Sequence, residues 1–188
     1  MKTTILRAAT LAALISVSAF AGLSVAADNP MVGGAPMLAT KNIIENAVNS
    51  KDHTTLVAAV KAAGLVETLE GKGPFTVLAP TNEAFAALPA GTVDNLLKPE
   101  NKAMLVKILT CHVIAAKAMS SDIMSMAKAD GGTHVVDTVG GCKLSLKTDG
   151  GKVTVTDENG NVANVTIADV AQSNGVIHVI DKVLLPKS

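Results

Sequence analysis

Apolar side chains in the first two thirds of the chain recur at the spacing of α-helices. Over residues 53–63, Leu56 and Val60 share one face, which predicts an amphipathic helix. Gly64 follows and suits the left-handed conformation that ends many helices. Shorter helices are predicted over residues 42–48, 65–69, 81–87, 92–97, 99–110 and 121–130.

The last third of the chain changes to the two-residue period of β-strands. Val153 and Val155 alternate with threonines, as expected for a strand buried on one face. Strands are predicted over residues 75–79, 111–114, 133–139, 142–148, 152–157, 162–168 and 176–185. Glycine- and asparagine-rich turns separate most of the later ones. Helices that mostly precede strands predict a single α+β domain, with several helices packed on a bent, mostly antiparallel sheet.

The segment Phe75–Phe85 encodes a strand, a corner and the start of a helix. Its first five residues are apolar and rich in strand formers, and Pro80 has no N–H group to continue a ladder. Thr81 is a good N-cap, and Phe85 stands at the spacing of a hydrophobic staple with Pro80. We therefore expect this segment to turn sharply from the sheet into a helix.

Two stretches of the chain resemble the signature blocks of fasciclin domains. The first is Gly-Pro-Phe-Thr-Val-Leu-Ala-Pro-Thr-Asn-Glu-Ala-Phe at 73–85, and the second is Asn-Gly-Val-Ile-His-Val-Ile-Asp-Lys-Val-Leu-Leu-Pro at 174–186. The residues assigned to the blocks are Phe75, Thr76, Ala79, Pro80, Thr81, Asn82, Phe85, Asn174, Gly175, Ile177, His178, Asp181 and Leu184. The resemblance covers residues 41–186 and implies one fasciclin-like domain, a β-wedge with helices along it.

The N-terminal region is predicted to direct export. Lys2 and Arg7 precede an apolar run, and small residues at 24–27 suit a signal peptidase, so residues 1–27 are interpreted as a signal peptide. A retained membrane anchor is the alternative, because this run approaches spanning length, whereas no later segment does. Residues 28–40 contain Pro and Gly and are expected to be a flexible leader. The mature protein is expected to be a monomer in the periplasm or outside the cell.

Composition narrows the classes of partner. The chain has no Trp, no Tyr and three Phe, and its formal net charge at pH 7 is zero. Nucleic-acid binding is therefore not expected, because neither a basic patch nor a set of stacking side chains is available. Aromatic platforms for sugars are lacking for the same reason. The core must consist of aliphatic side chains, Ala and Met.

Cys111 and Cys142 form the complete set of cysteines in the chain. An even number in an oxidising compartment favours a disulfide bond. Closing a loop of about 32 residues stabilises a domain by roughly 3–4 kcal/mol on the chain-entropy account. The alternative is a pair of buried thiols that fill space in the core.

Four histidines raise the question of a metal or acid–base site. They are His53, His112, His134 and His178. None has the close spacing of a metal-ligand motif, so no metal or cofactor is predicted. His112 and His178 are instead expected to hydrogen-bond backbone groups where strands meet helices. A Cys111–His112 dyad is not expected either, because neighbours in a strand point to opposite faces.

The resemblance also implies candidate binding residues. Fasciclin domains usually carry a Tyr-His pair between the two blocks, which is linked to integrin adhesion in animal members. Here His112 matches, but Cys111 replaces the tyrosine, which weakens that link. Asp169 and Val170 match an acidic–aliphatic pair found before the second block. His112, Asp169 and Val170 are thus implied binding residues; alternatively, Val170 fills the core and Asp169 orients its loop.

These observations favour an exported, non-enzymatic binding module for a cell-surface or matrix protein or glycan. The alternative is a periplasmic carrier of a small apolar ligand. Its pocket would be lined by Met104, Met119, Met124 and Met126. An enzyme is not expected, because the chain has no nucleophile elbow, phosphate loop or dinucleotide fingerprint.

Overall fold

A computed structural model describes residues 29–187. The expected signal peptide lies outside the described residues. In chain order the elements are β1 (Met31–Val32), β2 (Ala35–Pro36), α1 (Ile43–Ala47), the 3-10 helix η1 (Lys51–His53), α2 (Thr54–Ala63), α3 (Val66–Glu70), β3 (Phe75–Pro80), α4 (Asn82–Ala86), α5 (Thr92–Leu96), the 3-10 helix η2 (Pro99–Asn101), α6 (Lys102–Thr110), β4 (Val113–Ile114), α7 (Ser120–Ala129), β5 (Thr133–Asp137), β6 (Lys143–Asp149), β7 (Lys152–Thr156), β8 (Val162–Gln172) and β9 (Gly175–Ile180).

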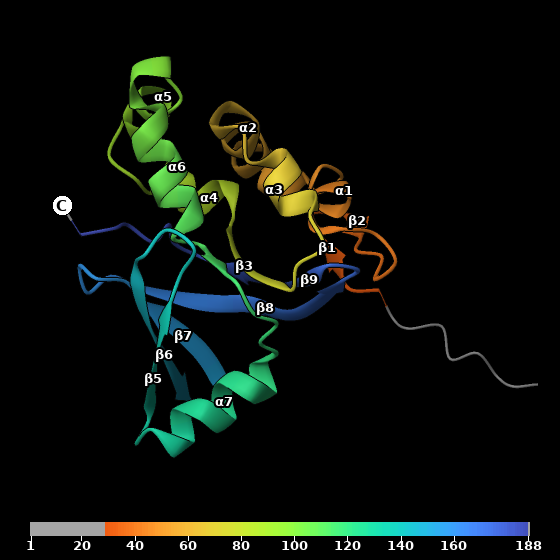
Figure 1. The fold of residues 1–188 in the computed structure, drawn as a ribbon, viewed down its shortest axis with the longest axis vertical. Helices are drawn as coiled ribbons and strands as arrows, with labels where there is room; N and C mark the ends of the chain where they lie inside the picture. The colour runs from red at the N-terminus through yellow and green to blue at the C-terminus, as the bar shows by residue number, and fades with distance from the viewer. Residues whose placement is uncertain (1–28, 188) are drawn as a thin grey trace, which may run out of the picture.

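The main sheet has seven strands in the order β4-β3-β9-β8-β7-β6-β5. Every neighbouring pair is antiparallel except β3 and β9, which run parallel from Phe75↔Gly175 to Pro80↔Ile180. The two signature blocks, far apart in sequence, thus lie side by side at the centre of the fold (Figure 1). The α+β class and the mostly antiparallel sheet are confirmed.

The sheet curls until its two edges nearly meet. Beyond the end of β5, the Val139 N–H group donates to the Val113 carbonyl of β4 at 2.8 Å, and Gly140 N–H donates to the Thr110 carbonyl at 3.0 Å. The predicted disulfide is present at the same junction, where Cys111 and Cys142 have Cα atoms 5.4 Å apart. It joins the end of α6 to the turn between β5 and β6.

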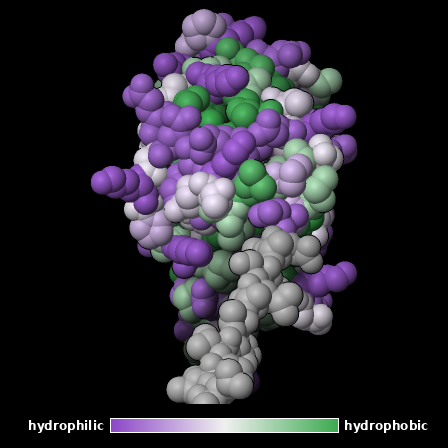
Figure 2. Space-filling view, turned by 90° about the vertical axis from the view of Figure 1, so that its right-hand side faces the viewer, coloured by the Kyte–Doolittle hydropathy of each residue, from purple (hydrophilic) through white to green (hydrophobic). Residues whose placement is uncertain are grey.

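The helices divide unequally between the two ends of the molecule. In Figure 1, α1 to α6 lie above the β3–β9 pair, whereas α7 lies alone at the opposite end and packs against β5, β6 and β7. Figure 2 turns the side that carries α1–α3 toward the viewer; that face is mostly hydrophilic, with apolar atoms surfacing in its upper part. Within residues 29–187, no helix combines the length and apolar character needed to cross a membrane.

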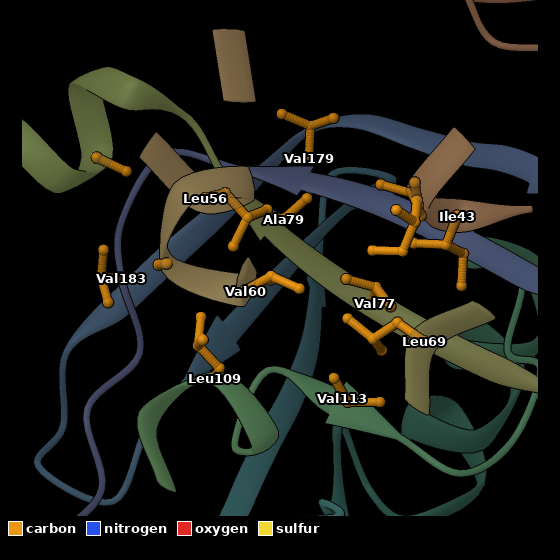
Figure 3. Packing of buried hydrophobic residues seen from close by; sticks show 14 of the residues in the cluster. Ile43, Leu56, Val60, Leu69, Val77, Ala79, Leu109, Val113, Val179 and Val183 are labelled. Atoms are coloured by element: carbon orange, nitrogen blue, oxygen red, sulfur yellow. The ribbon is translucent and has the colours of Figure 1, made fainter. Parts of the chain in front are cut away.

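The alternation of side chains along β3 and β9 creates two cores. Val77, Ala79 and Val179 point toward the helices and belong to the helix-side core (Figure 3). Leu78 and Ile180 point the other way. We call their cluster the sheet-side core, and its buried members are Leu78, Ala118, Ile123, Leu144, Leu146, Val153, Val155, Ala163, Ile180 and Leu184. The central strand pair is therefore buried on both faces, as its nearly continuous apolar sequence requires.

The segment before the domain is ordered rather than a flexible leader. β1 and β2 form a small hairpin, and Val32 and Met37 are buried in the helix-side core. The Gly33 carbonyl accepts a hydrogen bond from Lys51 N–H at 3.1 Å. The expectation was wrong because the Gly-Gly pair makes a tight turn, and the apolar residues around it find a place on the core.

A second correction concerns Cys111 and His112, which were expected to begin a strand. Cys111 is the C-cap of α6, and His112 N–H donates to the Leu109 carbonyl at 3.1 Å, so the helical turn continues past Thr110. The strand begins only at Val113. The opposite-face argument against a Cys–His dyad therefore does not apply, although the disulfide occupies the sulfur of Cys111.

Candidate binding site

The polar residues of the second block connect distant segments from inside the molecule. The Asn174 side chain donates to the carbonyls of Leu69 at 2.7 Å and Gly71 at 2.9 Å, and it accepts from Ile43 N–H at 3.1 Å. A side chain at Gly175 would collide with the Phe75 carbonyl on the neighbouring strand. These two positions thus tie the β8–β9 turn to α1, to the end of α3 and to β3.

The polar residues of the first block act in the same way. Thr76, which is fully buried, donates to the Ala116 carbonyl at 2.6 Å and accepts from Ala118 N–H at 2.9 Å. Thr81 accepts from Ala84 N–H at 3.3 Å, which confirms it as the N-cap of α4.

Asn82 and Asp181 complete the set of polar block residues. Asn82 donates to the Lys51 carbonyl at 2.7 Å and accepts from Thr55 N–H at 3.0 Å, so it caps the start of α2. The Asp181 carboxylate accepts from the Asn164 backbone and side-chain amides, both at 2.7 Å. The polar side chains of the two blocks thus form hydrogen bonds within the domain that hold its distant segments together.

His112 and His178 both bond backbone groups, as predicted. His112 Nε2 accepts from Leu184 N–H at 2.9 Å, so the proton is on Nδ1, which donates to the Ile108 carbonyl at 2.8 Å. Burial lowers the pKa of His112 to about 4, although the Ile108 carbonyl and the Asp157 carboxylate oppose this shift. The ring is therefore neutral at pH 7.

His178 is hydrogen-bonded to the backbone of Asp169. Its Nδ1 accepts from Asp169 N–H at 3.3 Å, and its Nε2–H donates to the Ala118 carbonyl at 2.8 Å. Burial lowers the pKa of His178, against smaller opposing effects of that carbonyl and of the Asp169 carboxylate. A buried, neutral imidazole thus fixes the position of the Asp169 backbone N–H group.

Asp169 has an unusual backbone. Among residues 29–187 it alone combines a side chain with a positive φ, of 60°, and it lies in an irregular stretch of β8 where the register with β9 shifts. Its carboxylate accepts from Ser120 N–H at 2.6 Å and from the Ser120 hydroxyl. The bulge turns Asp169 to a half-buried position at the start of α7, while the next residue, Val170, is fully buried.

The three implied binding residues therefore differ in their access to the surface. His112 is 2% exposed and Val170 is 0% exposed, so neither can contact a partner directly. This corrects their assignment as contact residues: His112 fixes the C-terminal segment, and Val170 fills the helix-side core. Asp169 alone reaches the surface. Together with Ser120, which bonds its carboxylate, and with the exposed chain neighbours Ser121 and Ala168, it forms what we call the Asp169 surface.

Sequence reasoning missed Ser120 as part of this surface. Ser120 and Asp169 are 49 positions apart, and no local pattern relates them. The only available signal was that Ser120 stands one position before the helix predicted at 121–130. A carboxylate that caps a helix from a distant strand has no signature in the sequence.

The four methionines do not form the expected pocket. Met104 lies on α6 and is 53% exposed, whereas Met124 and Met126 lie on α7 against the sheet-side core. Figure 1 places α6 and α7 at opposite ends of the molecule. An apolar cavity of about 60 Å³ is present instead among α1, α2, α3 and β3.

Comparisons with known proteins agree on one family. The sequence model of the fasciclin domain matches residues 51–186. Protein sll1483 of Synechocystis sp. is 54% identical over 144 residues, which cover 77% of this chain and 73% of that protein. The transforming growth factor-beta-induced protein ig-h3 of Sus scrofa is 40% identical over 131 residues, which cover 70% of this chain but only 17% of that longer protein.

A solved structure shows the same fold. It is the FAS1 domain pair of the insect cell adhesion molecule fasciclin I, which superposes with a TM-score of 0.69 at 19% sequence identity. The match covers 77% of this chain and 51% of that one, so this chain spans about half of the domain pair.

Proposed function

This chain belongs to the fasciclin domain family, and from that premise we propose that it is an exported, monomeric, non-enzymatic module for adhesion to a cell-surface or matrix protein or glycan. The observation that carries the proposal is the strained backbone of Asp169, whose φ is 60°. Such a conformation costs on the order of 1–3 kcal/mol and is concentrated at functional sites. The insect protein with the same fold, fasciclin I, is a cell adhesion molecule.

The Asp169 carboxylate retains capacity for a partner. It accepts two hydrogen bonds from Ser120, whereas an ionised carboxylate offers about four acceptor positions. The side chain is half-buried, so a donor from a partner can reach it. A cationic side chain or the hydroxyl groups of a glycan would suit this acceptor.

Two of the four histidines are unsuited to an acid–base role. His112 and His178 use both ring nitrogens on the backbone or on Leu184 and Asp169 amides. Neither ring therefore has a nitrogen available for proton transfer to a substrate. The His178 ring instead holds the backbone of Asp169, and the His112 ring holds the C-terminal segment at Leu184.

The test compares Asp169→Asn with Asp137→Asn. Asparagine tolerates a positive φ and keeps the shape of the side chain, so Asp169→Asn removes the charge with little effect on folding. Asp137 is an exposed carboxylate on β5, paired with Lys143 at 2.7 Å, and serves as the matched control. We expect attachment of protein-coated beads to cells or matrix to fall about tenfold for Asp169→Asn, corresponding to roughly 1.4 kcal/mol, and to stay unchanged for Asp137→Asn.

A strain that lacks the protein provides the second arm. The proposal predicts weaker attachment of that strain, restored by the wild-type protein and not by Asp169→Asn. Unchanged attachment of the deletion strain would reject adhesion as the function. Restoration by Asp169→Asn would keep adhesion and reject the Asp169 surface as its site.

A further inference from the structure

The cavity in the helix-side core has walls made almost wholly of hydrocarbon. Its volume is about 60 Å³, and Figure 3 shows Val60, Leu69, Val77, Leu109 and Val113 around the space. At roughly 10–15 Å³ for each water-sized group, it accommodates about four to six such groups. A cavity of this size can hold a short run of methylene groups.

The polar groups of the wall are already occupied. The Thr110 hydroxyl donates to the Val106 carbonyl at 2.7 Å, and both nitrogens of His112 are bonded to backbone groups. A polar guest would therefore lose its hydrogen bonds with water and find none inside, which is unfavourable. The part of a ligand that enters must be apolar.

The mouth of the cavity has a different character. Val57, Leu65 and Val66 in its lining are half-buried, which places apolar surface at the opening between α2 and α3. Lys61, in the last turn of α2, also lines the cavity, and its side chain is exposed. The combination is a hydrocarbon slot with a cation at its edge.

A second cation lies at the same end of α2. The Lys102 ammonium, at the start of α6, is 3.5 Å from the position that a Cβ atom on Gly64 would occupy. In the part of the chain that the structure covers, the two ion pairs are His134–Asp130 and Lys143–Asp137, so Lys61 and Lys102 are not neutralised by a neighbour. Glu67 and Glu70 of the nearby α3 take part in neither pair. Lys61 and Lys102 thus provide positive charge at the C-terminal end of α2.

We propose that this cavity binds the end of the hydrocarbon chain of a medium-chain carboxylate, while the rest of the chain lies over the half-buried residues of the opening and the carboxylate lies at the surface between Lys61 and Lys102. The chain enters between α2 and α3 and ends against β3. This binding activity goes beyond adhesion and uses a different part of the molecule from the Asp169 surface. The proposal also gives the half-buried apolar residues of the opening a function, because they would contact the alkyl chain while the lysines contact the carboxylate.

Titration calorimetry with sodium decanoate tests the proposal. Wild-type protein is expected to bind decanoate and to bind decanol, which lacks the charge, more weakly. Val60→Phe fills the cavity and is expected to abolish binding, while Lys61→Ala, at an exposed position, is expected to weaken decanoate binding about 2- to 5-fold, the range of an exposed ion pair. Lys147→Ala, an exposed site on β6, is the matched control and should bind as wild type does.

Two results would overturn the proposal: no binding of decanoate by the wild-type protein, or undiminished binding by a folded Val60→Phe variant. Should Val60→Phe fail to fold, Val60→Ile adds one methylene at the same place and is expected to reduce the affinity for decanoate. Decanol binding equal to that of decanoate would keep the cavity as a site but reject the role of the two lysines.

Discussion

The two faces of the β3–β9 pair are packed in different ways. On the sheet side, Leu146, Val155 and Ala163 are at most 1% exposed, and neighbouring strands close around them together with the single helix α7. On the helix side, the same strands meet short helices, and cavities of about 60 and 30 Å³ remain. Strands at a fixed spacing place side chains at regular depth, whereas short helices that cross a sheet leave gaps between them.

His53 shows the consequence for the helix side. It lies in the lining of the smaller cavity, beneath the β1–β2 hairpin, and its Nδ1 bonds the Ser50 hydroxyl at 2.9 Å. Its Nε2 is buried without a hydrogen-bond partner. Burial lowers the pKa of His53, against opposing effects of the Ala79 carbonyl, Asp52 and Glu83. The helix-side core thus tolerates two cavities and one buried nitrogen without a hydrogen bond. The same pair of strands therefore supports a tightly packed core on one face and a loosely packed core on the other.

The largest effect is expected from removing the disulfide bond, which links a helix of the helix side to the strands that enclose the sheet-side core. The Cys111–Cys142 bond joins α6 to the β5–β6 turn. Replacing both cysteines by serine is expected to lower the free energy of unfolding by about 2–5 kcal/mol, because the unfolded chain gains freedom. Urea denaturation measures the loss. Reductant should destabilise the wild type by a similar amount and leave the double variant unchanged; equal midpoints for all samples would show that the bond contributes nothing.

Acid is expected to produce the next largest effect. The folded-state pKa of His112 is about 4, below its value of about 6.5 in the unfolded chain. Between these values the unfolded state binds a proton that the folded state does not, so stability is full above about pH 6.5 and falls as the pH drops toward 4. His112 alone accounts for about 3 kcal/mol of this loss, and the lowered pKa values of His53 and His178 act in the same direction.

Urea midpoints between pH 4 and 8 measure this dependence. His112→Gln is the informative variant: it is expected to be less stable at pH 7 but to show a shallower slope, because one proton-uptake site is gone. A wild-type profile that is flat between pH 6.5 and 4 would contradict the buried neutral state of His112.

A pair of core substitutions gives the smallest and most direct contrast. Ala163 is fully buried in the sheet-side core, and Ala163→Val is expected to cost about 1–3 kcal/mol through overpacking. Val60 lines the larger cavity, and Val60→Ile is expected to change stability by less than about 0.5 kcal/mol or to increase it, because the added methylene fills space. Urea denaturation of both variants decides; equal losses would mean that the two cores are packed alike.

Local structure could be predicted where the signals lie within a few residues of one another. The strand, corner and helix of β3 and α4 follow from the apolar run, Pro80 and the Thr81 cap, and the structure contains all three. Predictions failed where a boundary or a contact depended on distant groups. Cys111 ends a helix because α6 packs against α2 and the disulfide holds its last turn, and nothing near Cys111 in sequence indicates this.

The candidate sites show the same division. Asp169 could be singled out from its position before the second block, but its positive φ and its bond to Ser120 result from a bulge in β8 and from where α7 begins. The cavity was expected at the methionines and was found among α1, α2 and α3, because spacing along a chain does not state which helices become neighbours.

By itself, the sequence determined most local elements, the apolar faces and the family, and it favoured a bond between the two cysteines. Periodicity and caps act over one or two turns, and they depend only on backbone sterics and on nearby hydrogen-bonding groups. The tertiary structure alone decided the parallel pairing of Phe75 with Gly175, the closure at Val139 and the position of the cavity. Those features depend on how complete elements pack together, since contacts between distant residues are selected by the burial of whole surfaces and not by any short pattern.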